Sequence, residues 1–213
     1  MKTRAILSLA GAALLASIGA ANASLLIVPS TGAGGIQATG ETVLDGGPGF
    51  PINIYGYIGP AYLQAVDTGY YQFTFEGAGT ASNTNTFTTL NTPATTFNNT
   101  STAAGTSFTE FLTAGSTIAF TFTSTQSGCA ITAPGTSANC AYLIALANSP
   151  TSLGATGPQS TAWIGLSDSA YPTTDSDFQD MVVRVDQIPE PASVAVFGAG
   201  LLALGLIRRR KTV

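Results

Sequence analysis

The side chains best suited to chemistry in this chain are carboxylates that gather near residue 180. Asp175, Asp177 and Asp180 stand at positions i, i+2 and i+5, a spacing at which a tight turn can bring carboxylates to one hard cation. Ca²⁺ takes roughly six to eight oxygen ligands, and neighbouring backbone carbonyls can complete such a set. With Asp168, which lies upstream, these residues form a candidate calcium site. The alternative is a solvated turn whose carboxylates accept hydrogen bonds from backbone N–H groups.

The charge distribution excludes several classes of function. The chain has 213 residues, with 7 Lys and Arg, 11 Asp and Glu, and no His. Between residues 24 and 188, Arg184 is the only basic residue and stands against ten acidic ones, so this stretch cannot neutralise nucleic-acid phosphates. Because the stretch holds neither His nor Lys, it also lacks the residues for a His-based triad, a His-ligated metal or a Schiff base.

Catalysis by paired carboxylates is the enzymatic chemistry that this composition leaves open. Glycoside hydrolysis uses two such groups, and Asp168 lies near Trp163 and Tyr171, which could form a sugar platform. A single Trp in a β-sandwich is more often part of the core, so we expect no enzymatic activity and no cofactor other than Ca²⁺. An exposed Trp163 would favour a carbohydrate-binding module, whereas a buried Trp163 would favour a structural protein.

The two cysteines, Cys129 and Cys140, are separated by a short segment that contains Pro134 and Gly135. In an exported protein, two cysteines at loop spacing favour a disulfide, and the alternative is a pair of unpaired thiols. A redox site is not expected, because the spacing is not that of a CxxC motif and no nearby cation would stabilise a thiolate. The sequence therefore predicts a structural disulfide.

The elements that must position these residues are strands. Apolar and polar residues alternate with a period of two in several stretches, as expected for strands that bury one face. The clearest are residues 50–55, 70–75, 117–122 and 181–186. Residues 141–147 form a continuous apolar run, either a central strand or a short helix, and residues 91–106 are predicted to be a mobile loop. We therefore expect one all-β domain over residues 24–187, a β-sandwich or jelly roll.

The N-terminus is typical of a secretory signal peptide. Lys2 and Arg4 precede the uncharged, mostly apolar run of residues 5–18, and Ala21 and Ala23 form a small-x-small cleavage pattern. The alternative is an N-terminal membrane anchor, but the run is short for a span. The sequence thus predicts a signal helix in residues 1–23, cleavage after Ala23, and the secretion translocon and signal peptidase as partners.

The C-terminus is typical of a membrane anchor. Residues 192–207 are uncharged and would form a helix about 24 Å long, somewhat short of the bilayer core, a deficit that snorkelling Arg side chains can absorb. The cluster Arg208, Arg209, Arg210 and Lys211 places the basic end in the cytoplasm and the acidic body outside. We therefore expect a single transmembrane helix that holds the protein in the inner membrane.

Pro189, Glu190 and Pro191, followed by an apolar helix and the basic cluster Arg208, Arg209 and Arg210, resemble the PEP-CTERM protein-sorting signal. The resemblance covers residues 188–213 and implies recognition by an exosortase, which processes such proteins near the Pro-Glu-Pro motif during export. It implies a bacterium that makes exopolysaccharide, and delivery to the cell surface or extracellular matrix, such as a biofilm. The function expected is that of a structural protein of this matrix that contacts exopolysaccharide. The alternative is a carbohydrate-binding module.

Overall fold

A computed structural model describes residues 25–29, 36–37, 57–58, 60–79, 81–91, 93–126, 128–146, 160–169, 178–188 and 200. Residues 23–188 form a compact unit. Over the described residues it contains fourteen strands in three antiparallel sheets, which confirms the all-β class. The expected signal helix and transmembrane helix fall outside the described residues, apart from residue 200. Among the described residues no helix is long and apolar enough to cross a bilayer.

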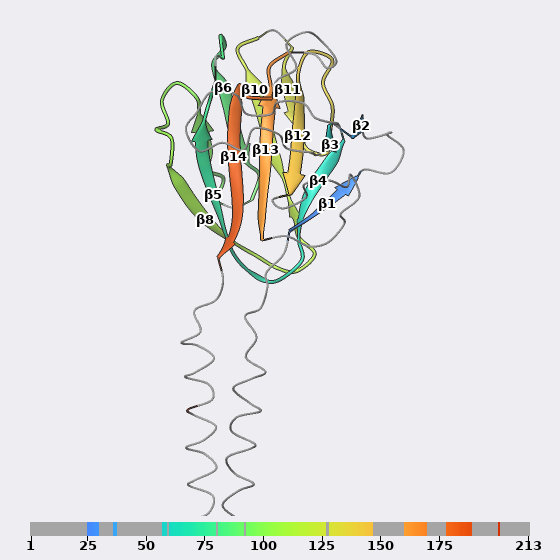
Figure 1. Cartoon of the computed structure of the whole chain (residues 1–213), viewed down its shortest axis with the longest axis vertical. Coiled ribbons are helices and arrows are strands. Elements are labelled where there is room, and N and C mark those ends of the chain that lie inside the picture. Colours follow the sequence, from blue (N-terminus) through green and yellow to red (C-terminus); the bar gives the residue numbers. More distant parts are fainter. Residues whose placement is uncertain are drawn as a thin grey trace, which may run out of the picture. The chain divides into compact units, whose positions relative to one another are not determined.

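One layer is a seven-stranded antiparallel sheet (Figure 1). Its strands, in spatial order, are β2 (Ile36–Gln37), β3 (Tyr57–Ile58), β12 (Ala141–Leu146), β13 (Thr161–Ser167), β14 (Met181–Ile188), β5 (Gly69–Gly77) and β8 (Ser107–Leu112). The C-terminal strand β14 therefore lies inside the sheet, hydrogen-bonded to β13 on one side and to β5 on the other. The residues that precede the C-terminal segment are thus held by two neighbouring strands.

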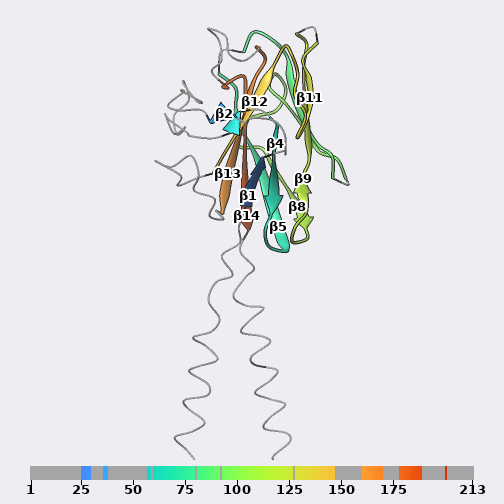
Figure 2. The same cartoon turned by 90° about the vertical axis from the view of Figure 1, so that its right-hand side faces the viewer.

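The other layer is built from two smaller sheets (Figure 2). The first contains β1 (Leu25–Pro29), β4 (Ala61–Ala65) and β9 (Thr117–Ile118), and the second contains β11 (Ala130–Thr132), β10 (Phe120–Ser124), β6 (Asn85–Thr89) and β7 (Thr96–Asn98). Only Ala119 separates β9 from β10, and its carbonyl accepts a hydrogen bond from the Leu90 N–H. The chain therefore passes directly from one small sheet into the other.

The two layers bury one core between them, and its residues follow the period of two that the sequence predicts. On β5 the side chains of Tyr71, Phe73 and Phe75 are fully buried, and Phe87 and Phe120 face them from the other layer. The core residues are joined by ring contacts, for example between Phe87 and Phe120, whose centroids are 5.2 Å apart. Each such side chain contributes about 1.5–3 kcal/mol on burial, so these aromatic residues hold the layers together.

Two segments clarify or correct the expectations from sequence. Residues 141–146 form the strand β12 and not a helix. The segment 91–106, expected to be a mobile loop, contains β7, because Phe97 is buried against Phe75 and Phe87 and brings Thr96–Asn98 into the sheet beside β6. The strand expected over residues 50–55 lies outside the described residues, and the finer jelly-roll arrangement stays a prediction.

Candidate functional site

Asp168 and Asp180 lie together where β13 ends and β14 begins. Asp180 accepts a hydrogen bond at Oδ2 from the Asp168 N–H, at 2.7 Å. Asp168 in turn accepts hydrogen bonds at Oδ2 from the side-chain amides of Asn83 and Asn85, each at 3.1 Å. Both carboxylates are at least nine-tenths buried. Asp175 and Asp177, the other two predicted ligands, lie outside the described residues.

This arrangement ties the start of β14 to two other parts of the fold. A parallel bridge pairs Gln179 with Leu166 of β13, and the Asp180 N–H donates to the Leu166 carbonyl at 3.1 Å. The Gly79 N–H donates to the Gln179 carbonyl at 2.7 Å, and a Cβ atom at Gly79 would collide with the Gln179 side chain. A side chain at position 79 would therefore displace that of Gln179.

The hydrogen bonds to Asp168 and Asp180 match the alternative reading, in which carboxylates cap backbone and amide donors. No group of three or more acidic, His or Cys side chains that could hold a metal occurs among the residues that the structure describes. Asn85 Oδ1 is buried, and it has no hydrogen-bond partner among the residues that the structure describes. It belongs to the amide that donates to Asp168, and a carbonyl oxygen of this kind suits Ca²⁺. Calcium binding by Asp168, Asp175, Asp177 and Asp180 therefore stays a prediction.

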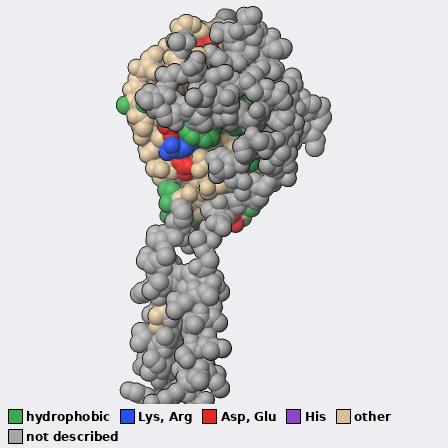
Figure 3. All heavy atoms as spheres, in the orientation of Figure 1, with side chains coloured by type: hydrophobic (Ala, Val, Ile, Leu, Met, Phe, Trp, Pro, Cys, Tyr) green, Lys and Arg blue, Asp and Glu red, His purple; other side chains and the backbone are tan. Residues whose placement is uncertain are grey.

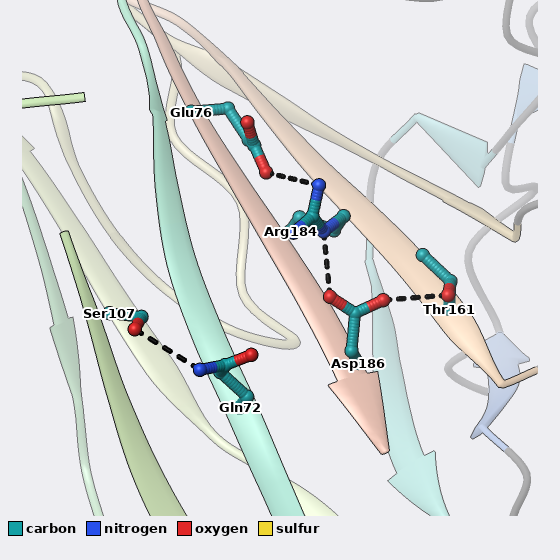
Figure 4. A network of polar contacts seen from close by, with 6 residues as sticks. All are labelled: Gln72, Glu76, Ser107, Thr161, Arg184 and Asp186. Atoms are coloured by element: carbon teal, nitrogen blue, oxygen red, sulfur yellow. Dashed lines mark hydrogen bonds and ion pairs between the residues drawn. The ribbon is translucent and has the colours of Figure 1, made fainter. Parts of the chain in front are cut away.

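A second polar group lies on the outer face of the seven-stranded sheet, around Arg184 of β14 (Figure 4). Arg184 forms ion pairs with Glu76 of β5 and Asp186 of β14, each at 2.6 Å. Asp186 also accepts a hydrogen bond from Thr161 Oγ1 of β13, at 2.7 Å. The space-filling view shows the basic side chain between acidic ones on this face (Figure 3). The group therefore links three adjacent strands.

The side chain of Trp163 is neither open to solvent nor fully buried, so its exposure alone does not choose between a carbohydrate-binding module and a structural protein. Its side chain is half-buried, and the Arg184 guanidinium lies 5.7 Å from the ring centroid, within the range of a cation–π contact. A ring covered in this way offers less area for stacking on a sugar than an open platform would. Tyr171, the other aromatic residue of the supposed platform, is outside the described residues.

Two buried tyrosines have raised pKa values. Burial raises the pKa of Tyr142 to about 12, and its hydroxyl donates to the Ala61 carbonyl at 2.6 Å while accepting from the Ala61 N–H at 3.2 Å. Burial likewise raises the pKa of Tyr71 to about 12, where the hydroxyl donates to the Asp67 carbonyl at 2.7 Å. Hydroxyls that hold their protons so firmly serve as structural hydrogen-bond donors and not as nucleophiles at neutral pH.

Glu110 of β8 is a buried carboxylate that no sequence motif marks. It accepts hydrogen bonds from Thr89 Oγ1 at 2.7 Å and from Asn91 Nδ2 at 2.6 Å. Thr89 Oγ1 also accepts the Thr95 N–H at 3.2 Å. The carboxylate thus joins the seven-stranded sheet to the turn between β6 and β7. The only sequence signal for it was a lone acidic residue in a long uncharged stretch.

The predicted disulfide between Cys129 and Cys140 is confirmed. Cys129 directly precedes β11 of the small sheet and Cys140 directly precedes β12 of the seven-stranded sheet, so the bond links the two layers. Both cysteines are buried. This position is typical of a structural bond and not of a redox site.

The remaining predicted residues are those of the sorting signal and of the signal-peptide cleavage site, and all lie outside the described residues. A protein-family model, PEP-CTERM protein-sorting motif, matches residues 187–211. The chain carries a PEP-CTERM sorting motif. The match begins within β14 and includes Pro189, Glu190, Pro191 and the three arginines. Comparison with curated proteins and with solved structures gave no match.

A PEP-CTERM motif is the signal that an exosortase recognises, so an exosortase is a partner of this chain. The motif implies that the protein is exported and is held at the membrane while it is processed, before it is displayed at the surface. Its position is consistent with the fold, because the motif starts where the last strand of the domain ends.

Proposed function

We propose that the chain is a structural protein of the bacterial surface or extracellular matrix, anchored in the inner membrane by residues 192–207 until an exosortase releases its β domain. The observation that carries this proposal is the sorting motif at residues 187–211, which begins at the end of a compact β domain. After processing, the domain of residues 24–187 is the part that acts outside the cell. Contact with exopolysaccharide in a biofilm is the role proposed for it.

A structural role, and not a catalytic one, is supported by the partners of the polar side chains. Asp168, Asp180 and Glu110 are each engaged by hydrogen-bond donors of the fold, and Arg184 is engaged by two carboxylates. Catalytic carboxylates in glycosidases need an open approach to a sugar and a protonation state poised for transfer. The side chains here are used to tie strands and layers together.

Intact-mass measurement of surface-extracted protein tests the proposal. The expected species starts at Ser24 and ends near residues 189–191, because signal peptidase and exosortase have removed both ends. In a strain without the exosortase, residues 192–213 should stay attached. A matched variant that replaces Pro189, Glu190 and Pro191 with Ala should also keep the tail. A species that still carries residues 192–213 in cells with active exosortase would contradict the proposal.

A carbohydrate-binding module is the second candidate, supported by the half-buried Trp163, whose ring contacts Arg184, the residue that is ion-paired with Glu76 and Asp186. Co-sedimentation of the processed protein with purified exopolysaccharide separates the two. Loss of binding in Trp163→Ala, with binding retained in Tyr70→Ala, would favour a dedicated sugar site around Trp163. Binding that neither substitution changes would favour a general structural association.

A further inference from the structure

Three exposed apolar side chains form a row at one end of the seven-stranded sheet. Ile188 of β14 is directly opposite Tyr70 of β5, which is directly opposite Phe111 of β8, so all three point to the same face. Their exposed fractions are 37% for Ile188, 54% for Tyr70 and 56% for Phe111. The two rings contact each other edge to face, with centroids 5.2 Å apart. We call these residues the apolar row.

The apolar row stands apart from the rest of that face. The next positions along the three strands are Asp186, Gln72 and Thr109, which are polar, and the ion pairs of Arg184 follow. Single exposed apolar residues need no explanation, but three in register across adjacent strands are typical of a surface that has a partner.

At the end of the sheet that carries the apolar row the two turns are nearly uncharged, whereas Asp186 lies next to the row on the face of the sheet. The two turns, residues 66–68 and 113–116, are joined by hydrogen bonds, including one from the Ala114 N–H to Thr68 Oγ1 at 2.9 Å. Asp67 is the only charged residue of these two turns. A surface of this kind can approach a lipid headgroup layer without desolvating many charges.

The chain itself limits how far the apolar row can be from a membrane. Ile188 is inside the sorting motif, and the uncharged run begins at Ala192. Four residues span at most about 14 Å when fully extended. The headgroup region is roughly 5–8 Å deep on each side of the hydrocarbon core. When the uncharged run of residues 192–207 is inserted in the bilayer, Ile188 is held within about one headgroup depth of the lipid surface. Because neighbouring strands are only about 5 Å apart, Tyr70 and Phe111 are held close to the surface as well.

We propose that the apolar row of Tyr70, Phe111 and Ile188 docks on the lipid headgroup region while the tail is still attached. This inference rests on the proposed membrane anchoring. Aromatic side chains are enriched at the membrane–water interface, where a ring with one polar end such as Tyr is favoured. Docking turns the end of the sheet that carries the apolar row toward the membrane, and it keeps the Pro-Glu-Pro segment within reach of an enzyme that acts at the membrane surface. Removal of the tail frees the row.

Quenching of tryptophan fluorescence by lipids tests the docking. Full-length Phe111→Trp is prepared in a Trp163→Phe background, so that the introduced indole is the single emitter, and is reconstituted in vesicles of phosphatidylethanolamine and phosphatidylglycerol with brominated acyl chains near the headgroups. The matched control is Leu90→Trp in the same background, because Leu90 is similarly exposed, at 47%, but lies in the other layer. Circular dichroism confirms that both variants are folded.

The expected result is strong loss of emission for Phe111→Trp in brominated vesicles and little loss for Leu90→Trp. Adding Tyr70→Ser and Ile188→Ser to Phe111→Trp should restore most of the emission. Vesicle flotation separates the two levels of inference. Protein that does not float overturns the membrane anchoring and the docking with it. Protein that floats while Phe111→Trp is no more quenched than Leu90→Trp overturns the docking alone. A loss of Phe111→Trp emission that depends on the amount of protein per vesicle and not on bromination also overturns it.

Discussion

The hydroxyl of Tyr142 illustrates how this molecule uses polar groups at the scale of single residues. It closes a reciprocal pair of hydrogen bonds with the backbone of Ala61, a residue of the other layer. A buried phenol that both donates and accepts is fully satisfied, whereas its anion would lose the donor and face an apolar surrounding. The protonated form is therefore the one that the fold stabilises.

The raised pKa of Tyr142 and of Tyr71 predicts a loss of stability in alkali. The usual tyrosine pKa is 10.0 and both are raised to about 12, so the folded state keeps protons that the unfolded state releases. Stability should be fully present below about pH 10 and should fall as the pH rises toward 12. Urea unfolding at several pH values measures this. Tyr142→Phe should flatten the alkaline decline, and an unchanged slope would contradict the assignment.

Calcium binding is the second prediction at the residue scale. Thermal melts of residues 24–188 in EDTA and in millimolar Ca²⁺ should differ by several degrees, because a ligand that binds only the folded state stabilises it. Asp177→Asn should remove most of the difference. Asp186→Asn is the matched control, since Asp186 is engaged by Arg184 and Thr161 and belongs to no proposed calcium ligand set. Identical wild-type curves in both buffers would leave only the hydrogen-bonded network of Asp168 and Asp180.

At the scale of elements, Glu110 connects the edge strand β8 to β6 of the opposite layer. Glu110→Ala would leave Thr89 Oγ1 and the Asn91 amide without their acceptor, so we expect a loss of about 2–3 kcal/mol in the free energy of unfolding. Urea denaturation provides the value. Thr109→Ala, on the outward side of the same strand, should cost much less. Equal losses in the two variants would show that the buried carboxylate contributes no special link.

The disulfide makes a second link between layers, from the start of β11 to the start of β12. Replacing both Cys129 and Cys140 with Ala should lower the free energy of unfolding by about 3 kcal/mol, because the unfolded chain gains the freedom of the closed loop. Urea denaturation of oxidised wild type, reduced wild type and the double variant gives the comparison. Reduced wild type should resemble the double variant, and equal stability of all three would contradict the prediction.

At the scale of the whole molecule, the strands with strict alternation were predictable and their partners were not. Residues 181–186 read as a strand because Met181, Val183 and Val185 point to one side, and β14 has this pattern. The ion pair of Arg184 with Asp186 lies within one strand, whereas its ion pair with Glu76 joins two strands. Glu76 comes from β5, and sequence periodicity does not give the register that pairs β5 with β14.

In the candidate site, too, the residues were predictable from sequence and their partners were not. The acidic residues were evident, but Asn83 and Asn85, which hold Asp168, are about 85 residues away along the chain. β7 was missed because it contains a single apolar residue, Phe97, and the ring contacts that make it a strand come from distant parts of the sequence. Short motifs such as Pro-Glu-Pro with a basic end need no tertiary information, so the sorting signal was found from sequence alone.

The interior position of β14 has a mechanical consequence for a protein that is held by its C-terminal end. A pull on Ile188 along the strand acts against the ladders to β5 and β13 at once, and it loads their hydrogen bonds together in shear. An edge strand pulled away sideways would lose its bonds one after another, at lower force. While the tail is attached, a tether that leaves from an inner strand lets the domain resist a pulling force without being unravelled from its attachment point.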